Sequence, residues 1–143
     1  MALSGGMDST CLLMHHLARN YRAICISYQY GQKHSVELER ASATIALCQS
    51  KGLNVQHHVV DLSPAMSLFD SALTSSKQEI PLGHYEENQM KLTVVPNRNA
   101  IFASILYGFA LSEAKRSGQK VILALGVHSG DHAIYPDCRP EFY

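Results

Sequence analysis

The chain of 143 residues is long enough for one compact domain, and its 12 basic and 12 acidic side chains give a net charge of zero, which provides no global field for a nucleic acid or an anionic membrane surface. Its four cysteines lie far apart without a C-x-x-C pair, which excludes a disulfide framework or zinc knuckle built from adjacent cysteines. No apolar run of about eighteen residues occurs, so we expect a cytoplasmic protein without a signal peptide or membrane span.

A glycine pair lies near the start of the chain, within the sequence SGGMDS at residues 4–9. Glycine reaches positive φ without a Cβ clash, so Gly5 and Gly6 can turn successive N–H groups toward one point, at which the following helix aims its positive dipole end. A plain tight turn is the alternative. Asp8 and Ser9 favour a phosphate site, because a carboxylate beside a phosphate needs a bridging ion such as Mg²⁺. The absence of a nearby lysine argues against γ-phosphoryl transfer.

Strands and helices alternate over the first 62 residues. The predicted elements are a helix over 8–20, a strand over 23–28, a helix that Ser35 caps and Gly52 ends, and a strand over 55–62. Short links between alternating elements are typical of an α/β fold with a parallel sheet and helices on both faces. In such folds ligands bind at the carboxyl ends of the strands.

The second half of the chain begins with a break in this rhythm. Proline, glycine and clustered Ser and Thr predict an inserted loop over about 63–92, with a turn or two of helix. Asn97 is a good N-cap for the next helix, which carries Lys115 and Arg116 in its last turn and ends at Gly118. A strand over 121–126 follows, and residues 127–143 are rich in polar side chains.

Polar clusters follow three of these strands, at residues 4–9, 28–34 and 128–139. The carboxyl ends of parallel strands meet at one edge of a sheet, so we expect the three clusters to converge there.

Four segments in this order resemble the PP-loop ATP pyrophosphatase superfamily and, within it, the 7-cyano-7-deazaguanine synthase family. They are SGGMDS at 4–9, YGQKH at 30–34, VPNRN at 95–99 and YPDCRPEF at 135–142. The resemblance implies a Rossmann-like sheet and an ATP-dependent ligase, which adenylates 7-carboxy-7-deazaguanine, forms an amide with ammonia and dehydrates it to a nitrile. It also implies a role in queuosine-type biosynthesis, small-molecule substrates, no direct nucleic-acid partner and a homodimer.

The resemblance also assigns nucleotide-binding roles. Phosphate is expected at Ser4, Gly5, Gly6 and Ser9, and Mg²⁺ at Asp8, while Gln32 and His34 belong to the nucleotide pocket.

Substrate binding is expected from Arg98, Asp131, Tyr135, Asp137 and Arg139, with Asp8, Arg98 and Asp131 as the catalytic residues. Arg98 pairs with the α-phosphate or the substrate carboxylate, unless it is a plain surface arginine. Asp131 and Asp137 accept the donors of the guanine-like base, and Arg139 binds the carboxylate, although Asp137 and Arg139 can instead pair with each other.

Two features of the last polar cluster admit other interpretations. His128, Asp131 and His132 are spaced closely enough to chelate a metal, but solvated or substrate-facing histidines are the more frequent case. Cys138 has no base at a fixed distance, so we interpret it as packing or substrate-adjacent rather than as a nucleophile.

The chain departs from the family pattern at both ends. Family members carry four clustered cysteines that hold zinc beyond the YPDCRPEF segment, and the first strand here is only residues 1–3. We therefore expect a fragment, or a numbering that starts inside a longer reading frame, with one domain over 1–143 and no zinc ligands. Three other functions stay open: a non-catalytic nucleotide-binding module, a tRNA-modifying or sulfur-transferring PP-loop enzyme, and a ligase that joins deazaguanine to another acceptor such as a protein amine.

Overall fold

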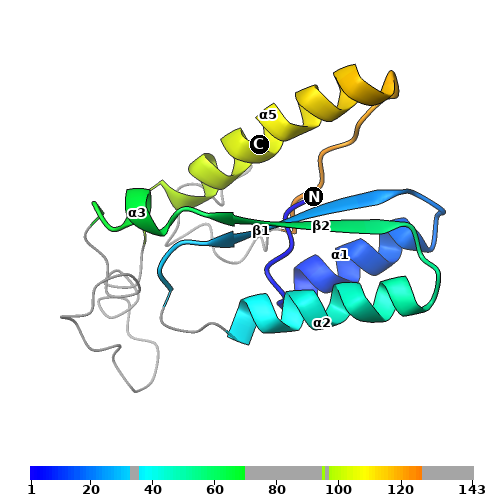
Figure 1. The fold of residues 1–143 in the computed structure, drawn as a ribbon, viewed down its shortest axis with the longest axis horizontal. Coiled ribbons are helices and arrows are strands. Elements are labelled where there is room, and N and C mark those ends of the chain that lie inside the picture. The colour runs from blue at the N-terminus through cyan, green and yellow to red at the C-terminus, as the bar shows by residue number, and fades with distance from the viewer. Residues whose placement is uncertain (33–35, 70–94, 96, 127–143) are drawn as a thin grey trace.

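The computed structural model describes residues 1–32, 36–69, 95 and 97–126. Its elements in chain order are α1 (Met7–Leu17), β1 (Ala23–Gln29), α2 (Val36–Ser50), β2 (Val55–Asp61), α3 (Ser63–Met66) and α5 (Arg98–Ser117) (Figure 1). Strands β1 and β2 pair in parallel, in a register that runs from Ala23 opposite Val55 to Gln29 opposite Asp61. The predicted α/β fold with a parallel sheet is therefore confirmed for this part of the chain.

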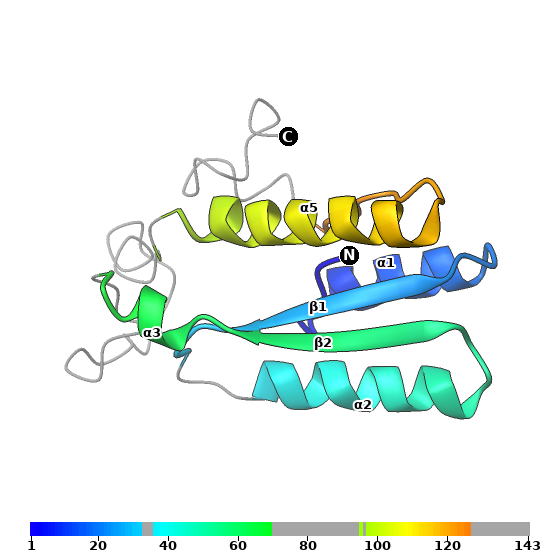
Figure 2. The same cartoon turned by 45° about the horizontal axis from the view of Figure 1, so that its top comes forward.

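Helices cover both faces of the sheet (Figure 2). On one face, Leu13 and Leu17 of α1 and Ile45 of α2 pack against Cys25 and Val55 in one buried cluster. On the other face, α3 and α5 cover alternate residues of β1, where Ile26 and Tyr28 are buried with Met66 and Leu106. Both faces of β1 are thus buried, which explains why its sequence is almost continuously apolar.

The first three residues form a minimal strand beside β1. Leu3 N–H donates to the Ile26 carbonyl at 2.9 Å, and Ile26 N–H donates to the Met1 carbonyl at 2.9 Å, which makes a single parallel bridge between Ala2 and Ile26. On the other side, Ala2 N–H donates to the Ala124 carbonyl at 3.3 Å. Residues 1–3 therefore lie between β1 and the segment 121–126.

The predicted strand over 121–126 is wrong, because the structure assigns no strand to these residues. Their sequence has high strand propensity, but a three-residue neighbour provides only the one bond to Ala124. The side chains of Val121, Ile122 and Leu123 are 36 to 56% exposed. Strand formation depends on pairing and packing with neighbours as well as on propensity, and within the described chain the pairing of this segment is limited to that bond.

The predicted helices are confirmed with small changes at their ends. Helix α1 ends at Leu17 rather than near Asn20, because residues 18–20 form tighter turn bonds and Asn20 adopts a φ of 60°. Gly118 ends α5 with a φ of 67°, and its N–H donates to the Ala114 carbonyl at 2.9 Å.

The predicted N-cap of α5 is wrong, whereas the predicted helical turn in the insertion is present. Asn97 stands at the N-cap position but has a φ of 57°, and its side chain makes no capping hydrogen bond, so its predicted capping role is wrong. A left-handed backbone turns the side chain away from the extended geometry that capping uses. The predicted helical turn at the start of the insertion is confirmed by α3, and residues 70–94 of the insertion lie outside the described residues.

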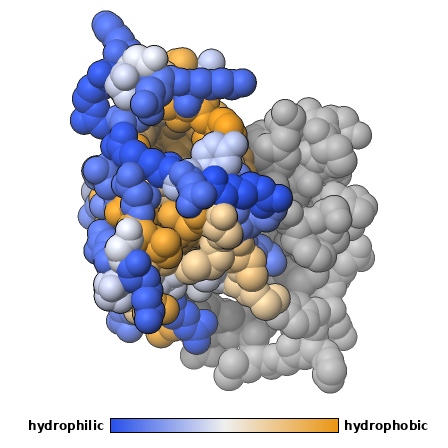
Figure 3. All heavy atoms as spheres, turned by 90° about the vertical axis from the view of Figure 1, so that its right-hand side faces the viewer, coloured by the Kyte–Doolittle hydropathy of each residue, from blue (hydrophilic) through white to orange (hydrophobic). Residues whose placement is uncertain are grey.

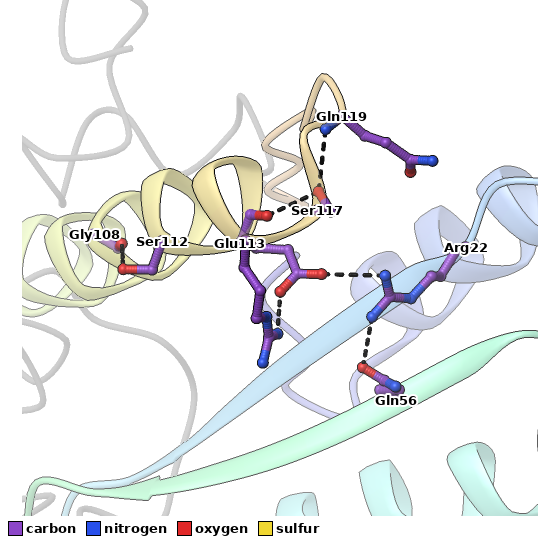
Figure 4. A network of polar contacts seen from close by, with 8 residues as sticks. Arg22, Gln56, Gly108, Ser112, Glu113, Ser117 and Gln119 are labelled. Carbon is purple, nitrogen blue, oxygen red and sulfur yellow. Dashed lines mark hydrogen bonds and ion pairs between the residues drawn. The ribbon is translucent and has the colours of Figure 1, made fainter.

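An ion-pair network around the buried Glu113 connects α5 to the sheet (Figure 4). Glu113 is 5% exposed and accepts hydrogen bonds from Arg116 on its own helix and from Arg22 at 3.1 Å. Arg22 precedes β1 and also donates to Gln56 of β2 at 3.0 Å. The hydrogen bond from Arg116 lowers the pKa of Glu113, burial opposes this shift, and the charges of Arg116 and Arg22 lower the pKa further.

A cavity of about 150 Å³ lies beside this network, between α5, the start of β1 and the segment 119–124. Figure 3 faces this end of the molecule and shows apolar side chains around the hollow. Because Ala23 and Ile24 line it, the cavity lies at the amino end of β1. It is therefore separate from the strand ends at which ligands of parallel sheets bind.

Candidate functional site

The glycine loop after the first strand is closed by a ring of hydrogen bonds. Gly6 N–H donates to Ser4 Oγ at 3.2 Å, the hydroxyls of Ser4 and Ser9 lie 3.0 Å apart, and Ser9 Oγ donates to the Gly6 carbonyl at 3.2 Å. A hydroxyl has one proton, so with Ser9 donating to Gly6 the proton between the two serines comes from Ser4. Ser4 N–H adds a bond to Ser9 Oγ at 3.2 Å. The two serines among the four predicted phosphate-binding residues therefore also hold the loop in shape.

The two glycines of the loop have different roles. Gly5 has a φ of 81°, as the prediction for the pair requires, but Gly6 has an extended backbone with a φ of −76°. The expectation of positive φ at Gly6 is therefore wrong. A Cβ on Gly5 would collide with the Glu37 carbonyl and lie 2.8 Å from the Ala41 nitrogen. Gly5 thus lets the loop pack directly on the backbone of α2.

The N-terminus of α1 is open at this loop. Gly6 is its N-cap residue and provides no side-chain capping bond, and the helical bonds start with Thr10 N–H donating to the Gly6 carbonyl at 3.1 Å. The N–H groups of the first turn therefore have no bonding partner within the helix. Asp8 is exposed in this turn, where a carboxylate is favourable to the helix dipole. Such a terminus is suited to binding an anion.

Gly126 brings the segment 121–126 against the start of α1. A Cβ built on Gly126 would lie 3.2 Å from the Ser9 nitrogen and 3.3 Å from the Asp8 carbonyl carbon. Its φ lies outside the left-handed region, so the backbone conformation does not require glycine there. The glycine is instead favoured by the close approach to the Asp8–Ser9 peptide, where a side chain would be tightly packed. The end of the segment 121–126 therefore lies against the glycine loop that follows residues 1–3.

The loop after β1 is shaped by the side chain of Gln32. Its Oε1 accepts a hydrogen bond from Tyr30 N–H at 2.8 Å, and its Nε2 donates to the Tyr28 carbonyl at 3.3 Å. Gly31 between them has a φ of 82°. Gln32 was predicted to line a nucleotide pocket, and in the structure its amide closes the turn that presents Tyr30.

Arg98, the first residue of α5, meets this turn. Its guanidinium carbon lies 5.8 Å from the centre of the Tyr30 ring, and its Nε donates to Asn99 Oδ1 at 3.3 Å. Tyr30 itself is buried. The second and third motifs, YGQKH and VPNRN, are thus brought together in space.

The neighbouring Tyr28 is held as a hydrogen-bond donor. Burial raises the pKa of Tyr28 to about 12, and its hydroxyl donates to the Phe102 carbonyl at 2.8 Å. The phenol therefore remains protonated throughout the physiological pH range.

Sequence reasoning did not identify Tyr30 or Gly126 as site residues, although both stand in or beside the recognised segments. The sequence did carry a signal for Gly126, because it is a glycine directly after the apolar run at 121–125. A glycine in such a position often marks a site where another backbone approaches closely. The remaining predicted residues, His34, Asp131, Tyr135, Asp137 and Arg139, lie outside the described residues, as do His128, His132 and Cys138.

Metal-binding clusters and membrane-spanning helices are both absent from the ranges 1–32, 36–69, 95 and 97–126. These ranges contain no group of three or more His, Cys, Asp or Glu side chains placed to hold a metal ion. None of their helices combines the length and apolar character that a membrane span requires.

Comparisons with known proteins agree on one family. A family model described as queuosine biosynthesis protein QueC matches residues 1–143. A protein of Caldicellulosiruptor saccharolyticus named 7-cyano-7-deazaguanine synthase is 49% identical over 99% of this chain and 59% of its own length. Proteins with the same name from Alteromonas mediterranea and Methanoregula boonei are 45% and 43% identical, over 97% and 99% of this chain.

The chain spans 59% and 61% of the lengths of these last two relatives, so it corresponds to less than two thirds of each protein it matches. No solved structure matches the chain.

Proposed function

Because this chain belongs to the QueC family of queuosine biosynthesis proteins, we propose that its glycine loop and the start of α1 bind the phosphates of ATP for adenylation of a deazaguanine carboxylate. The observation that carries this function is the uncapped N-terminus of α1 behind a preformed glycine loop. Its first-turn N–H groups and positive dipole end stabilise negative charge without a lysine.

The chemistry that fits this site is the conversion of 7-carboxy-7-deazaguanine to 7-cyano-7-deazaguanine. A carboxylate oxygen attacks the α-phosphorus of ATP, the bond to pyrophosphate breaks, and an acyl adenylate forms. Ammonia attacks the acyl carbon, loses a proton and expels AMP, which leaves the amide. The amide oxygen attacks a second ATP, pyrophosphate leaves and the nitrogen loses one proton, which gives an O-adenylated imidate. Expulsion of AMP with loss of the second nitrogen proton then gives the nitrile. In both activations charge develops on pyrophosphate, which is where the loop donors act.

Individual residues have separate roles in this scheme. The Met7, Asp8 and Ser9 N–H groups bind pyrophosphate oxygens, and the Ser4 and Ser9 hydroxyls keep the loop in the binding conformation. Arg98 binds an anionic oxygen of ATP or of the substrate carboxylate, since a guanidinium can bind either group through two hydrogen bonds.

Magnesium and the remaining substrate contacts complete the proposal. Asp8 is exposed beside the loop and is the residue that would hold Mg²⁺, which supplies charge neutralisation at the phosphates. Asp131, Tyr135, Asp137 and Arg139 bind the deazaguanine, and His34 belongs to the nucleotide pocket. The family resemblance supports a cytoplasmic homodimer, and a zinc site formed by residues other than those described here.

The test is the identity of the nucleotide products. A protein that carries this chain, supplied with 7-carboxy-7-deazaguanine, ammonia, ATP and Mg²⁺, is expected to release AMP and pyrophosphate and to form a nitrile, as measured by chromatography and mass spectrometry. Asp8→Asn should reduce the rate at a fixed Mg²⁺ concentration. Cys11→Ser, an exposed position on the same helix, is the matched control and should leave the rate unchanged.

Two outcomes would contradict the proposed function. Release of ADP would place bond cleavage at the γ-phosphate rather than the α-phosphate. Binding of ATP without release of AMP would identify a nucleotide-binding module instead of a ligase.

A further inference from the structure

We propose that Tyr30 is a positioning residue, whose aromatic ring holds the Arg98 guanidinium so that it can bind an anionic oxygen group of the substrates. This role rests on the proposed function, because the anion is a phosphate of ATP or the carboxylate of the second substrate. The two residues lie 68 positions apart in the chain but 5.8 Å from guanidinium carbon to ring centre. A cation at this distance over an aromatic face is attracted by the ring quadrupole.

Arg98 needs such support because of its place in the fold. It is the first residue of α5, where the positive end of the helix dipole disfavours a cation. Within the described residues it forms no ion pair with a carboxylate, and its Nε donates to the neutral Asn99 amide oxygen at 3.3 Å. Arg98 as a whole residue is half-buried. In the part of the chain that the structure describes, the guanidinium thus faces an aromatic ring and no acid, an arrangement suited to binding an anionic ligand.

The Tyr30 ring is fixed by contacts from two elements. It packs at 58° against Phe102 of α5, with 5.5 Å between ring centres. On the other side Phe102 stacks on Tyr28 at 4.1 Å and 10°, and the Tyr28 hydroxyl donates to the Phe102 carbonyl at 2.8 Å. The Gln32 amide holds the backbone of Tyr30 at 2.8 Å. The ring is 8% exposed, so its position is determined by the packing of β1 against α5.

This arrangement lies at the carboxyl end of β1, where α5 begins (Figures 1 and 2). The glycine loop follows the neighbouring strand at the same edge of the sheet. Tyr30 thus connects the turn after β1 to the cation of α5, and its ring replaces the carboxylate that usually orients a functional arginine. A carboxylate in that place would compete with the anionic ligand, whereas an aromatic face does not.

A double-mutant cycle on ligand binding tests this role. Tyr30→Leu should weaken binding of Mg-ATP, or raise the KM for the carboxylate substrate, by roughly 3- to 30-fold, the range of a cation–π contact. Tyr30→Phe keeps the ring and should stay within about twofold of wild type. In an Arg98→Gln background, Tyr30→Leu should cause no further change. Titration calorimetry with Mg-ATP and steady-state kinetics for the carboxylate substrate show which anion Arg98 binds.

Tyr28→Leu is the matched control, because it removes an equivalent ring from the same cluster without a contact to Arg98. It is expected to lower stability while its effect on binding is the same with and without Arg98→Gln. A second readout needs no ligand: the Arg98 Nε–H resonance should lose its ring-current shift in Tyr30→Leu but retain it in Tyr30→Phe.

The outcomes separate this role from the proposed function. If wild-type protein binds Mg-ATP and the carboxylate substrate but Tyr30→Leu changes neither constant, the positioning role is wrong and the proposed function stands. The positioning role would also be wrong if Tyr28→Leu and Tyr30→Leu showed the same coupling energy with Arg98→Gln. Both substitutions would then act by loosening the packing of the aromatic cluster as a whole. If wild-type protein binds neither substrate, the proposed function itself fails.

Discussion

Gly5 and Gly52 adopt the same left-handed backbone in different surroundings. Their φ angles are 81° and 72°, yet a side chain on Gly52 would meet nothing within 4 Å, whereas one on Gly5 would collide with α2. Comparison of the two positions therefore distinguishes two reasons why a position favours glycine. One is the strain of a left-handed backbone, and the other is lack of space for a side chain. Any L-residue is strained at this φ, but only Gly5 is also required by its neighbours.

Alanine at each position should show the difference directly. Gly52→Ala is expected to lower the free energy of unfolding by about 1–2 kcal/mol, the cost of a left-handed residue. Gly5→Ala should cost roughly 2–5 kcal/mol, because overpacking against the backbone of Glu37 and Ala41 adds to the same strain. Urea denaturation of both variants measures the two values. Equal losses would mean that the contact with α2 is not a constraint on the loop.

Gly126 is favoured by proximity alone, so its substitution should affect the site more than the fold. A methyl group there would lie 3.2 Å from the Ser9 nitrogen and displace the first turn of α1 by a few tenths of an ångström. Since small displacements of binding groups are costly, Gly126→Ala should weaken Mg-ATP binding by about 3- to 10-fold. Gly108→Ala, in open space on α5, is the control and should stabilise the helix by about 0.5–1 kcal/mol. Calorimetric titration and urea denaturation of both variants provide the comparison, and unchanged affinity in Gly126→Ala would contradict this role.

Among the elements, α5 is attached to the sheet by the ion pairs of the buried Glu113 carboxylate, in addition to the hydrogen bond from Tyr28 to Phe102. Glu113 joins Arg116 of the helix to Arg22 before β1, and Arg22 continues to Gln56 of β2. The hydrogen bond from Arg116 is the main cause of the lowered pKa of Glu113, with burial opposing it and the two arginine charges adding to it. Because the native pKa lies below the ordinary value of 4.5, ionised Glu113 contributes stability above pH 4.5, and this contribution is lost as pH falls through the lower native pKa.

Glu113→Gln should therefore have a pH-dependent effect. At pH 7 the variant is expected to unfold at lower urea concentration than wild type, because both arginines lose their charged partner. The difference should shrink steadily below pH 4.5, where wild-type Glu113 takes up a proton on unfolding. Glu37→Gln serves as control, since Glu37 is exposed and forms no ion pair within the described residues. A difference that persists unchanged at acid pH would show that Glu113 acts through packing rather than charge.

Elements with their own local signals were predictable from the sequence. Apolar spacing and a terminal glycine located α2 and α5, and an apolar run located β1, because these signals act within a few residues. The segment 121–126 has the same strand-forming residues, but its pairing depends on a partner of three residues. Asn97 has the right side chain for a cap and the wrong φ. Both errors arise because strand pairing and the backbone angle at a helix start depend on tertiary contacts, which the propensities of single residues do not include.

Across the whole molecule, the candidate site was predictable as a set of segments but not as a set of contacts. Convergence at the carboxyl edge is an expectation from parallel topology, and the structure shows two parts of it, Gly126 beside Ser9 and Arg98 beside Tyr30, while residues 128–139 lie outside the described residues. That Ser9 and Gln32 bind their own loops could not be read from residue types, because a hydroxyl or an amide serves a ligand and a turn equally well. The cavity at the opposite strand ends has no counterpart in any recognised motif.

A ligand that contacts both the glycine loop and Arg98 would join helices on opposite faces of the sheet, because α1 covers one face and α5 the other. Mg-ATP at 100 times its Kd should therefore raise the free energy of unfolding by about 2.7 kcal/mol and slow hydrogen exchange at the start of both helices. Each kcal/mol corresponds to a Tm increase of roughly 2–4 °C for a chain of this size. Arg98→Gln should retain protection at α1 and lose it at α5, as measured by exchange mass spectrometry. Protection confined to α1 in the wild-type protein would mean that ATP occupies the loop without reaching Arg98, and would assign Arg98 to the carboxylate substrate instead.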